Sequence, residues 1–258
     1  MEYQEYLKNK RSIQSILIGF LDSDTSSEED YQNLIELLEE LRGQTDQYDI
    51  EEVLHLLTKI ANNHYRNSHF FEKIERILKI FEEQLNNLSK HDIFNIFKNN
   101  KRILLFLFEQ KILVPEKYML KTITKHKYMT KYYPHYFYIE FRSLFQDQLR
   151  RKVYESFKKL TNDKVDRFKE NRMNGENESY ICYLIRNDMI GQFITYVDKN
   201  NITLSMTIEP SIYETNSFLL KNNENITLIE YAAFFGSIQI FVFKRISYRS
   251  NFVGLWSS

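Results

Sequence analysis

The sequence predicts an all-α protein, an array of antiparallel helical hairpins of the α-solenoid type, and three observations lead to this prediction. Apolar residues recur at steps of three and four through the first two thirds of the chain, which is the period of one helical face. Glycine (6) and proline (3) are scarce among 258 residues, so few residues interrupt the periodic segments. The spacers between these segments are short, and we therefore expect consecutive helices to pack as hairpins.

The clearest single helix is the segment SSEEDYQNLIELLEELRG, residues 26–43. Ser26 and Glu29 have the spacing of a capping box at its start, and Gly43 can end it in a left-handed conformation. The apolar stripe between these ends consists of Tyr31, Leu34, Ile35, Leu38 and Leu41. The sequence thus predicts the start, the buried face and the end of this helix.

Further helices are expected from the same pattern along the N-terminal region. The expected ranges are 49–61, 70–88, 92–97, 102–113 and a segment that begins at Pro115 and continues through Ile123. Pro134 opens the longest expected helix, which ends near Thr161 after about seven turns. These segments predict an array of helical pairs.

A polar stretch follows the longest helix and marks the expected domain boundary. The segment TNDKVDRFKENRMNGENE, residues 161–178, contains Gly175 and few residues able to anchor a core. We therefore expect a linker with the boundary near Asn174. The predicted domains are a helical N-terminal array over residues 1–174 and a second domain over residues 175–258.

A group of small residues stands out in TLIEYAAFFGSIQIF, residues 227–241. Thr227 can cap a helix, and two consecutive alanines leave no bulk, so neighbouring helices can approach closely. Gly236 can supply the positive φ that reverses the chain between two short antiparallel helices. This spacing resembles the ankyrin repeat. The residues assigned to the repeat signature are Thr227, Glu230, Ala232, Ala233, Gly236, Ile238, Ile240 and Phe241.

Two positions depart from the ankyrin pattern, because Leu228 stands where the pattern has proline and Glu230 where it has histidine. Thr227 and Glu230 have the spacing of a capping box, with the glutamate able to reach back to the Thr227 amide. The turn therefore keeps a plausible lock. The alternative interpretation is an amphipathic helix that happens to contain two alanines and a glycine.

A weaker copy of the same pattern lies upstream in SYICYLIRNDMIGQFITYVDKNN. Its aligned residues precede their counterparts by 48 positions, whereas an ankyrin repeat spans about 33 residues. We therefore expect a degenerate or capping repeat with an insertion within residues 202–225. The aligned residues are Leu184, Ile185, Asp188, Ile190 and Phe193.

These segments, together with TIEPSIYETNSFLLKNN and with PHYFYIEF at residues 134–141, resemble a large protist family of ankyrin-repeat proteins with an uncharacterised helical N-terminal region. The resemblance implies an all-α array that ends in ankyrin-like repeats. Members of such a family continue into many further repeats, whereas this chain ends with VFKRISYRSNFVGLWSS. We therefore expect a truncated member whose last 17 residues do not complete the fold, with residues 246–258 exchanging their amide protons rapidly.

Composition limits the class of partner. Lysine plus arginine equals aspartate plus glutamate, 35 each, so net charge gives no reason to expect nucleic acid or an anionic membrane. Acidic residues dominate 22–83 and basic residues 111–172, which either solvated helix faces or a binding surface would explain. No apolar stretch approaches the roughly 20 residues that cross a bilayer. A single cysteine, Cys182, fits a reducing compartment, so we expect an intracellular, cytoplasmic protein.

The sequence contains no recognisable catalytic or metal-binding constellation. It lacks a glycine-rich phosphate loop, a nucleophile elbow and zinc-ligand spacing, and its six histidines are scattered; His64 and His69 come closest to a pair. Cys182 has no adjacent positive charge to stabilise a thiolate, so a buried thiol is expected. We therefore expect neither an enzyme nor a cofactor.

The basic, aromatic segment 125–145 offers an alternative site. Aromatic rings interleaved with Lys127 and Lys131 could stack on RNA bases and hold phosphates. Alternatively, Phe137 and Phe141 share a helix face and anchor the core. The favoured function is a non-catalytic protein–protein interaction module, an ankyrin-type scaffold with an unidentified protein partner. A helical-repeat RNA-binding protein is the alternative.

Overall fold

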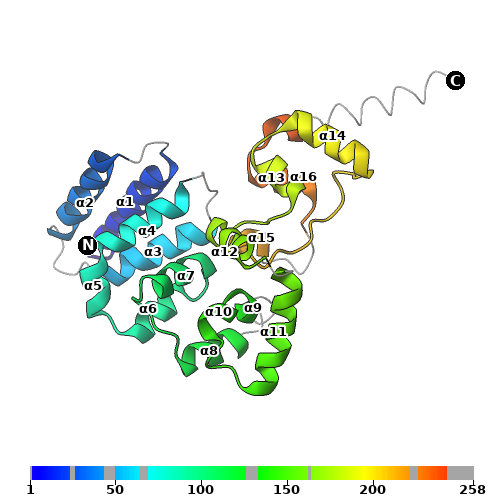
Figure 1. Ribbon diagram of the computed structural model, residues 1–258. Helices are drawn as coiled ribbons and strands as arrows, with labels where there is room; N and C mark the ends of the chain where they lie inside the picture. The colour runs from blue at the N-terminus through cyan, green and yellow to red at the C-terminus, as the bar shows by residue number, and fades with distance from the viewer. Residues whose placement is uncertain are drawn as a thin grey trace. The chain divides into compact units, whose positions relative to one another are not determined.

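The computed structural model describes residues 2–23, 27–43, 50–63, 69–125, 133–161, 164–220 and 226–242. The regular elements in these ranges are all helices, supplemented by one isolated antiparallel bridge between Thr207 and Thr227 (Figure 1). The prediction of an all-α fold is therefore confirmed for this part of the chain. The chain divides into two compact units, unit 1 (residues 1–165) and unit 2 (residues 166–258).

Unit 1 is built from helices that contact both their neighbours and helices further along the chain. Helix α1 packs on α2, α3 and α4, and α6 packs on α7. Helices three places apart also meet, since α3 contacts α6 and α4 contacts α7. The helices are α1 (Glu2–Asp22), α2 (Glu28–Gly43), α3 (Ile50–Asn63), α4 (Phe70–Ile80), α5 (Glu82–Asn87), α6 (Lys90–Phe97), α7 (Lys101–Glu109), α8 (Lys117–Lys125), α9 (Tyr133–Tyr136), α10 (Tyr138–Phe141) and α11 (Asp147–Thr161).

Helix α7 lies in the core of unit 1, as expected for a helix that is apolar around most of its circumference. Every residue from Lys101 to Phe108 is buried. The two charged residues at its start have partners, because the guanidinium of Arg102 contacts the carboxylate of Glu75 and the ammonium of Lys101 lies 5.2 Å from the ring centroid of Tyr136. Pairing of this kind is what allows charged groups to be buried.

The start of α2 differs by one residue from its prediction. The hydroxyl of Ser27 accepts a hydrogen bond from the Asp30 amide at 3.2 Å, and the Asp30 carboxylate accepts one from the Ser27 amide at 3.0 Å. This reciprocal pair has the geometry of a capping box with aspartate in place of glutamate. Ser26, the predicted cap, lies outside the described residues.

The longest predicted helix, Pro134–Thr161, is wrong as a continuous element, because the chain forms α9, α10 and α11 instead. Phe137 leaves the helical conformation with φ −97° and ψ 20°, and a second turn follows α10. The break lets α11 fold back against both α9 and α10, contacts that a straight helix would prevent. The predicted helix 70–88 is likewise interrupted at Phe81, between α4 and α5.

Unit 2 contains α12 (Val165–Asn174), which begins at the boundary, α13 (Tyr180–Arg186), α14 (Ile190–Asn200), α15 (Ser217–Leu220), α16 (Leu228–Phe234) and a helical segment at 238–242. The expected linker therefore holds a helix. Phe168 of α12 is buried, and its ring centroid lies 5.7 Å from that of Tyr213. This buried aromatic residue anchors a segment whose polar composition had indicated a linker, and the units divide after Val165 rather than near Asn174.

Candidate binding site

Two helical hairpins in unit 2 repeat each other at an interval of 48 residues. The first hairpin, residues 179–200, consists of α13, a turn and α14; the second hairpin, residues 227–242, consists of α16, a turn and the helical segment 238–242. Helices α13 and α16 both span seven residues, and their bounds differ by 48 at each end. Each helix is preceded by a hydroxyl N-cap, Ser179 or Thr227, that accepts from the amide three residues on.

The turns of the two hairpins match in backbone conformation. Asp188 and Gly236, 48 residues apart, both have positive φ, 47° and 65°. An aspartate tolerates this region better than most residues, and glycine adopts it without steric cost. The turn hydrogen bonds are also repeated, from Asn187 N to Tyr183 O and Phe235 N to Tyr231 O, from Asp188 N to Ile185 O and Gly236 N to Ala233 O, and from Met189 N to Leu184 O and Ser237 N to Ala232 O.

The predicted capping box at the start of α16 is confirmed. The hydroxyl of Thr227 accepts from the Glu230 amide at 3.3 Å, and the Glu230 carboxylate accepts from the Thr227 amide at 2.8 Å. The Thr227 hydroxyl also donates to this carboxylate, and these hydrogen bonds, from the side chain first and then the backbone, lower the pKa of Glu230. The departure from histidine at this position is thus accommodated by a second type of cap.

The two alanines of the signature lie in different environments. Ala232 is fully buried against α13, as expected, whereas Ala233 is exposed. Consecutive helical residues point about 100° apart, so a helix covered on one side by α13 buries only one of the two. The expectation that Ala233 packs against a neighbouring helix is therefore wrong for the described residues.

Polar groups join the two hairpins. The carboxylate of Asp188 accepts hydrogen bonds from the amides of Gln239 and Ile240, both at 3.1 Å, and so caps the start of the helical segment 238–242 from the other hairpin. The hydroxyl of buried Ser237 donates to the carbonyl of Ile185. Sequence reasoning aligned Asp188 with Gly236 but missed its capping role, which an acidic residue in a predicted turn could have suggested.

The segment between the hairpins covers the start of α16. The amides of Leu228 and Ile229, which have no partner inside the helix, donate to the carbonyls of Met206 (3.0 Å) and Leu204 (3.1 Å). The Ile208 amide donates to the carbonyl of Ile226 at 2.7 Å. Residues 202–208, within the predicted insertion, therefore fix where the second hairpin begins.

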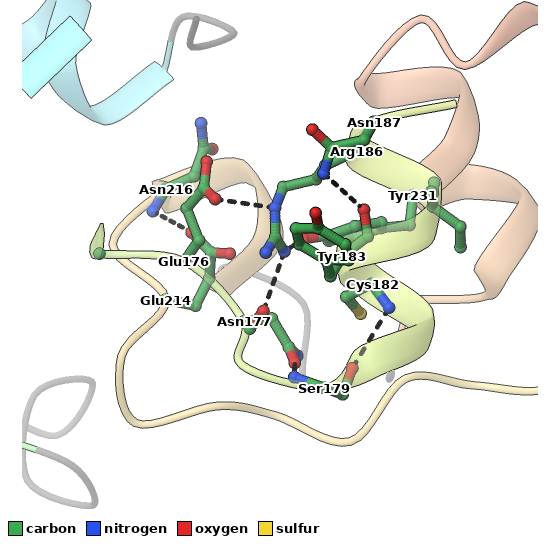
Figure 2. Close-up of polar contacts among 12 residues, drawn as sticks. Glu176, Asn177, Ser179, Cys182, Tyr183, Arg186, Asn187, Glu214, Asn216 and Tyr231 are labelled. Atoms are coloured by element: carbon green, nitrogen blue, oxygen red, sulfur yellow. Dashed lines mark hydrogen bonds and ion pairs between the residues drawn. The ribbon is translucent and has the colours of Figure 1, made fainter. Parts of the chain in front are cut away.

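A buried polar cluster around Arg186 lies beneath the hairpins (Figure 2). Its guanidinium forms an ion pair with Glu176 at 2.7 Å and donates to the Asn177 carbonyl at 2.9 Å and to the Tyr231 hydroxyl at 2.8 Å. Burial by itself lowers the pKa of Arg186, but the Tyr231 and Glu176 oxygens outweigh it and raise the pKa. Arg186 thus ties the preceding loop and both hairpins together.

Cys182 lies in the same region and is fully buried. Burial raises the pKa of its thiol to about 11, although the Ser179 hydroxyl and Arg186 act in the opposite direction. Burial also raises the pKa of Tyr231. Both groups are protonated at neutral pH, so this cluster offers no thiolate or phenolate nucleophile. The expectation of a buried thiol is confirmed.

The burial of equivalent positions separates the two hairpins. Phe193 of the first hairpin is fully buried, whereas its counterpart Phe241 is 49% exposed. The second hairpin presents an apolar surface, which we call the outer face. It consists of Ala233, Ile238, Phe241 and Val242.

The opposite side of the first hairpin also exposes large rings. Tyr180 and Tyr183 of α13 are 51% and 46% exposed, and their rings stack at 6.3 Å between centroids. The ring of Tyr196 meets Tyr180 edge-on at 5.2 Å. Tyr180 and Tyr183 form what we call the tyrosine face. Sequence reasoning did not single out these residues, because it placed them around a buried cysteine.

The other candidate chemistry receives no support where the structure describes it. Within the described ranges, no group of three or more His, Cys, Asp or Glu residues is arranged to hold a metal ion. His69 is exposed and contacts Glu72 at 3.0 Å, and His64 lies outside the described residues. Among the described helices, none is long and apolar enough to cross a membrane.

The described part of the aromatic segment belongs to the core of unit 1. Phe137, Phe141 and Phe145 are buried, and the first two meet the ring of Phe108 edge-on at 5.7 and 5.4 Å. Buried rings cannot stack on bases, so the core interpretation holds for these residues. Lys127 and Lys131 lie outside the described residues.

The geometry thus yields two equivalent hairpins, a buried polar joint between them and two exposed surfaces, the outer face and the tyrosine face. The last residues of the chain, 243–258, and with them the expectation for 246–258, lie outside the described part. Comparison of the chain with protein families, with curated proteins and with solved structures found no match.

Proposed function

We propose that the chain is a non-catalytic module that binds other proteins, an ankyrin-type scaffold in which short helical hairpins stack. The observation that carries the proposal is the repeated hairpin with opposite burial. The second hairpin repeats the caps and turn of the first, yet exposes Phe241 where the first buries Phe193. Contiguous exposed apolar side chains mark interaction surfaces on folded proteins.

The contacts in unit 1 support the same proposal. Helix α3 lies against α6 and α4 against α7, and α6 lies against α7, an arrangement typical of hairpins stacked in register. Stacks of this kind present extended surfaces, and residues on those surfaces can vary without disturbing the fold. The buried, protonated Cys182 supports binding rather than covalent catalysis.

The proposal is tested by protein capture with an altered outer face. Purified wild-type chain, an Ile238→Glu/Phe241→Glu variant and a Met206→Glu control are immobilised and exposed to extract of the source cells. Met206 is 49% exposed, like Phe241, but lies outside the outer face. We expect at least one protein retained by wild type and control and lost from the double variant, and the same difference in a calorimetric titration with that protein once purified. Identical retention by all three would contradict the proposal.

A further inference from the structure

We propose that the chain associates head to tail with itself, the outer face of one copy packing on the tyrosine face of the next. This inference names one partner for the proposed binding function and rests on that function. It comes from a joint that the chain already contains between its two hairpins.

The internal joint shows which surfaces fit together. On the first hairpin it uses Ile185 and Phe193, both fully buried, and on the second it uses Leu228 and Tyr231, also buried. All four belong to one hydrophobic cluster with Leu184, Val197, Ala232 and Ile240. The outgoing side of one hairpin therefore packs on the incoming side of the next.

Each end of this pair exposes half of a second joint. Forty-eight residues after Ile185 and Phe193 come Ala233 and Phe241 of the outer face, so the outgoing side of the second hairpin is exposed. Forty-eight residues before Leu228 and Tyr231 come Tyr180 and Tyr183, so the incoming side of the first hairpin is exposed as well. Tyr183 and Tyr231 are the same residue type at equivalent positions. A second copy thus supplies the surface that the internal joint selects.

The joint between copies lacks the polar contacts of the internal one. Inside the chain, Arg186 donates to Tyr231 and Asp188 caps the following helix. Their counterparts 48 residues later are Phe234 and Gly236, which cannot make these contacts. The intermolecular joint is therefore apolar and aromatic, and we expect it to be reversible and dependent on concentration. Aromatic side chains are enriched at such interfaces.

The two surfaces differ from each other, so the association is heterologous and can add copies at both ends. This property permits a test with the full chain in sedimentation velocity over a range of concentrations. Wild type should show a mass that rises with concentration beyond a dimer. Tyr183→Glu, which spoils the incoming side, and Phe241→Glu, which spoils the outgoing side, should each be monomeric.

The decisive arm is an equimolar mixture of these two variants. Tyr183→Glu keeps an intact outer face and Phe241→Glu an intact tyrosine face, so the mixture should form a one-to-one dimer and stop there. Tyr154→Glu and Met206→Glu are matched controls, since their wild-type side chains are 48% and 49% exposed, and both should associate like wild type. Circular dichroism checks that every variant is folded.

Three results would overturn the inference: a wild type that is monomeric at every concentration, a mixture that contains no dimer, or single variants that associate like wild type. These failures differ from failure of the proposed function. A monomeric wild type that still captures a foreign protein through Phe241 would remove the self-association and leave the binding function standing.

Discussion

The two hairpins of unit 2 share a backbone and differ in what covers it. Phe193 and Phe241 occupy equivalent positions, yet one is fully buried and the other is half exposed. Caps and a residue with positive φ are local features, and they reproduce the hairpin wherever they occur. Burial depends on the neighbouring element. The comparison therefore separates what local sequence determines from what packing determines.

Position 182 and its counterpart 230 make the same point in chemical terms. Each is the third residue of its helix, and each amide donates to a hydroxyl cap. Burial raises the pKa of the Cys182 thiol, whereas hydrogen bonds from Thr227 lower the pKa of the exposed Glu230 carboxyl. The same backbone site thus stabilises the neutral form of one side chain and the charged form of the other.

The largest expected difference between the hairpins concerns their phenylalanines. Phe193→Ala should lower the free energy of unfolding of unit 2 by about 3–5 kcal/mol, because it leaves a cavity in a packed core. Phe241→Ala should change it by no more than about 0.5 kcal/mol, as at most surface positions. Urea unfolding followed by hydrogen exchange of unit 2 amides measures both, at a concentration where the chain is monomeric. Equal losses would break the comparison.

The reactivity of cysteine at the two equivalent positions should differ next most strongly. The pKa of Cys182 rises from 9.0 to about 11, so its thiolate population at neutral pH falls by roughly 100-fold. We expect native Cys182 to react with a thiol reagent at least about 100-fold more slowly than in the denatured chain. A Cys182→Ser/Glu230→Cys variant should react rapidly while folded. Fast reaction of native Cys182 would contradict its burial.

The bond between the hairpins should have an intermediate effect. Asp188→Gly keeps the positive φ but removes both hydrogen bonds to the amides of Gln239 and Ile240, and should cost about 1–2 kcal/mol, as for loss of a helix cap. Asp188→Asn retains one acceptor oxygen and should cost less. Amide exchange at Gln239 and Ile240 reports the loss directly. Unchanged protection in Asp188→Gly would show that the cap is not needed.

The smallest expected effect is the pH dependence of the capping box. Folding lowers the pKa of Glu230, so its contribution is present above the ordinary value of 4.5 and is lost as the pH falls through the lower folded value. Glu230→Gln should reduce Tm at pH 6 by no more than about 2 °C, because the group is exposed and screened. This difference should shrink at pH 3. A difference that stayed constant with pH would argue against a charged cap.

Sequence periodicity predicted the fold well where local signals are complete. Thr227 with Glu230 gave the start of α16, and the 48-residue alignment of Asp188 with Gly236 gave the turn of both hairpins. Prediction failed where distant packing decides. The stripe from Pro134 to Thr161 has helical spacing throughout, but α11 must turn back to reach α9.

The candidate site was predictable only in part for the same reason. A pair of alanines indicates close helix packing without saying which alanine meets a neighbour, and the structure buries Ala232 but not Ala233. The tyrosine face was missed because Tyr183 and Tyr231, although equivalent, differ in exposure solely through the presence of a preceding hairpin. Exposure of this kind follows from the stacking order and has no local signature.

The central claim, equivalent hairpins with one covered and one uncovered outgoing side, is tested most directly by enlarging the same position in both. Ile185→Phe places extra volume in a packed joint and should cost about 1–3 kcal/mol of unfolding free energy. Ala233→Phe, at the equivalent position, adds more volume to an exposed site and should change the unfolding free energy by no more than about 0.5 kcal/mol. A loss for Ala233→Phe as large as that for Ile185→Phe, measured on monomeric chain, would contradict the account.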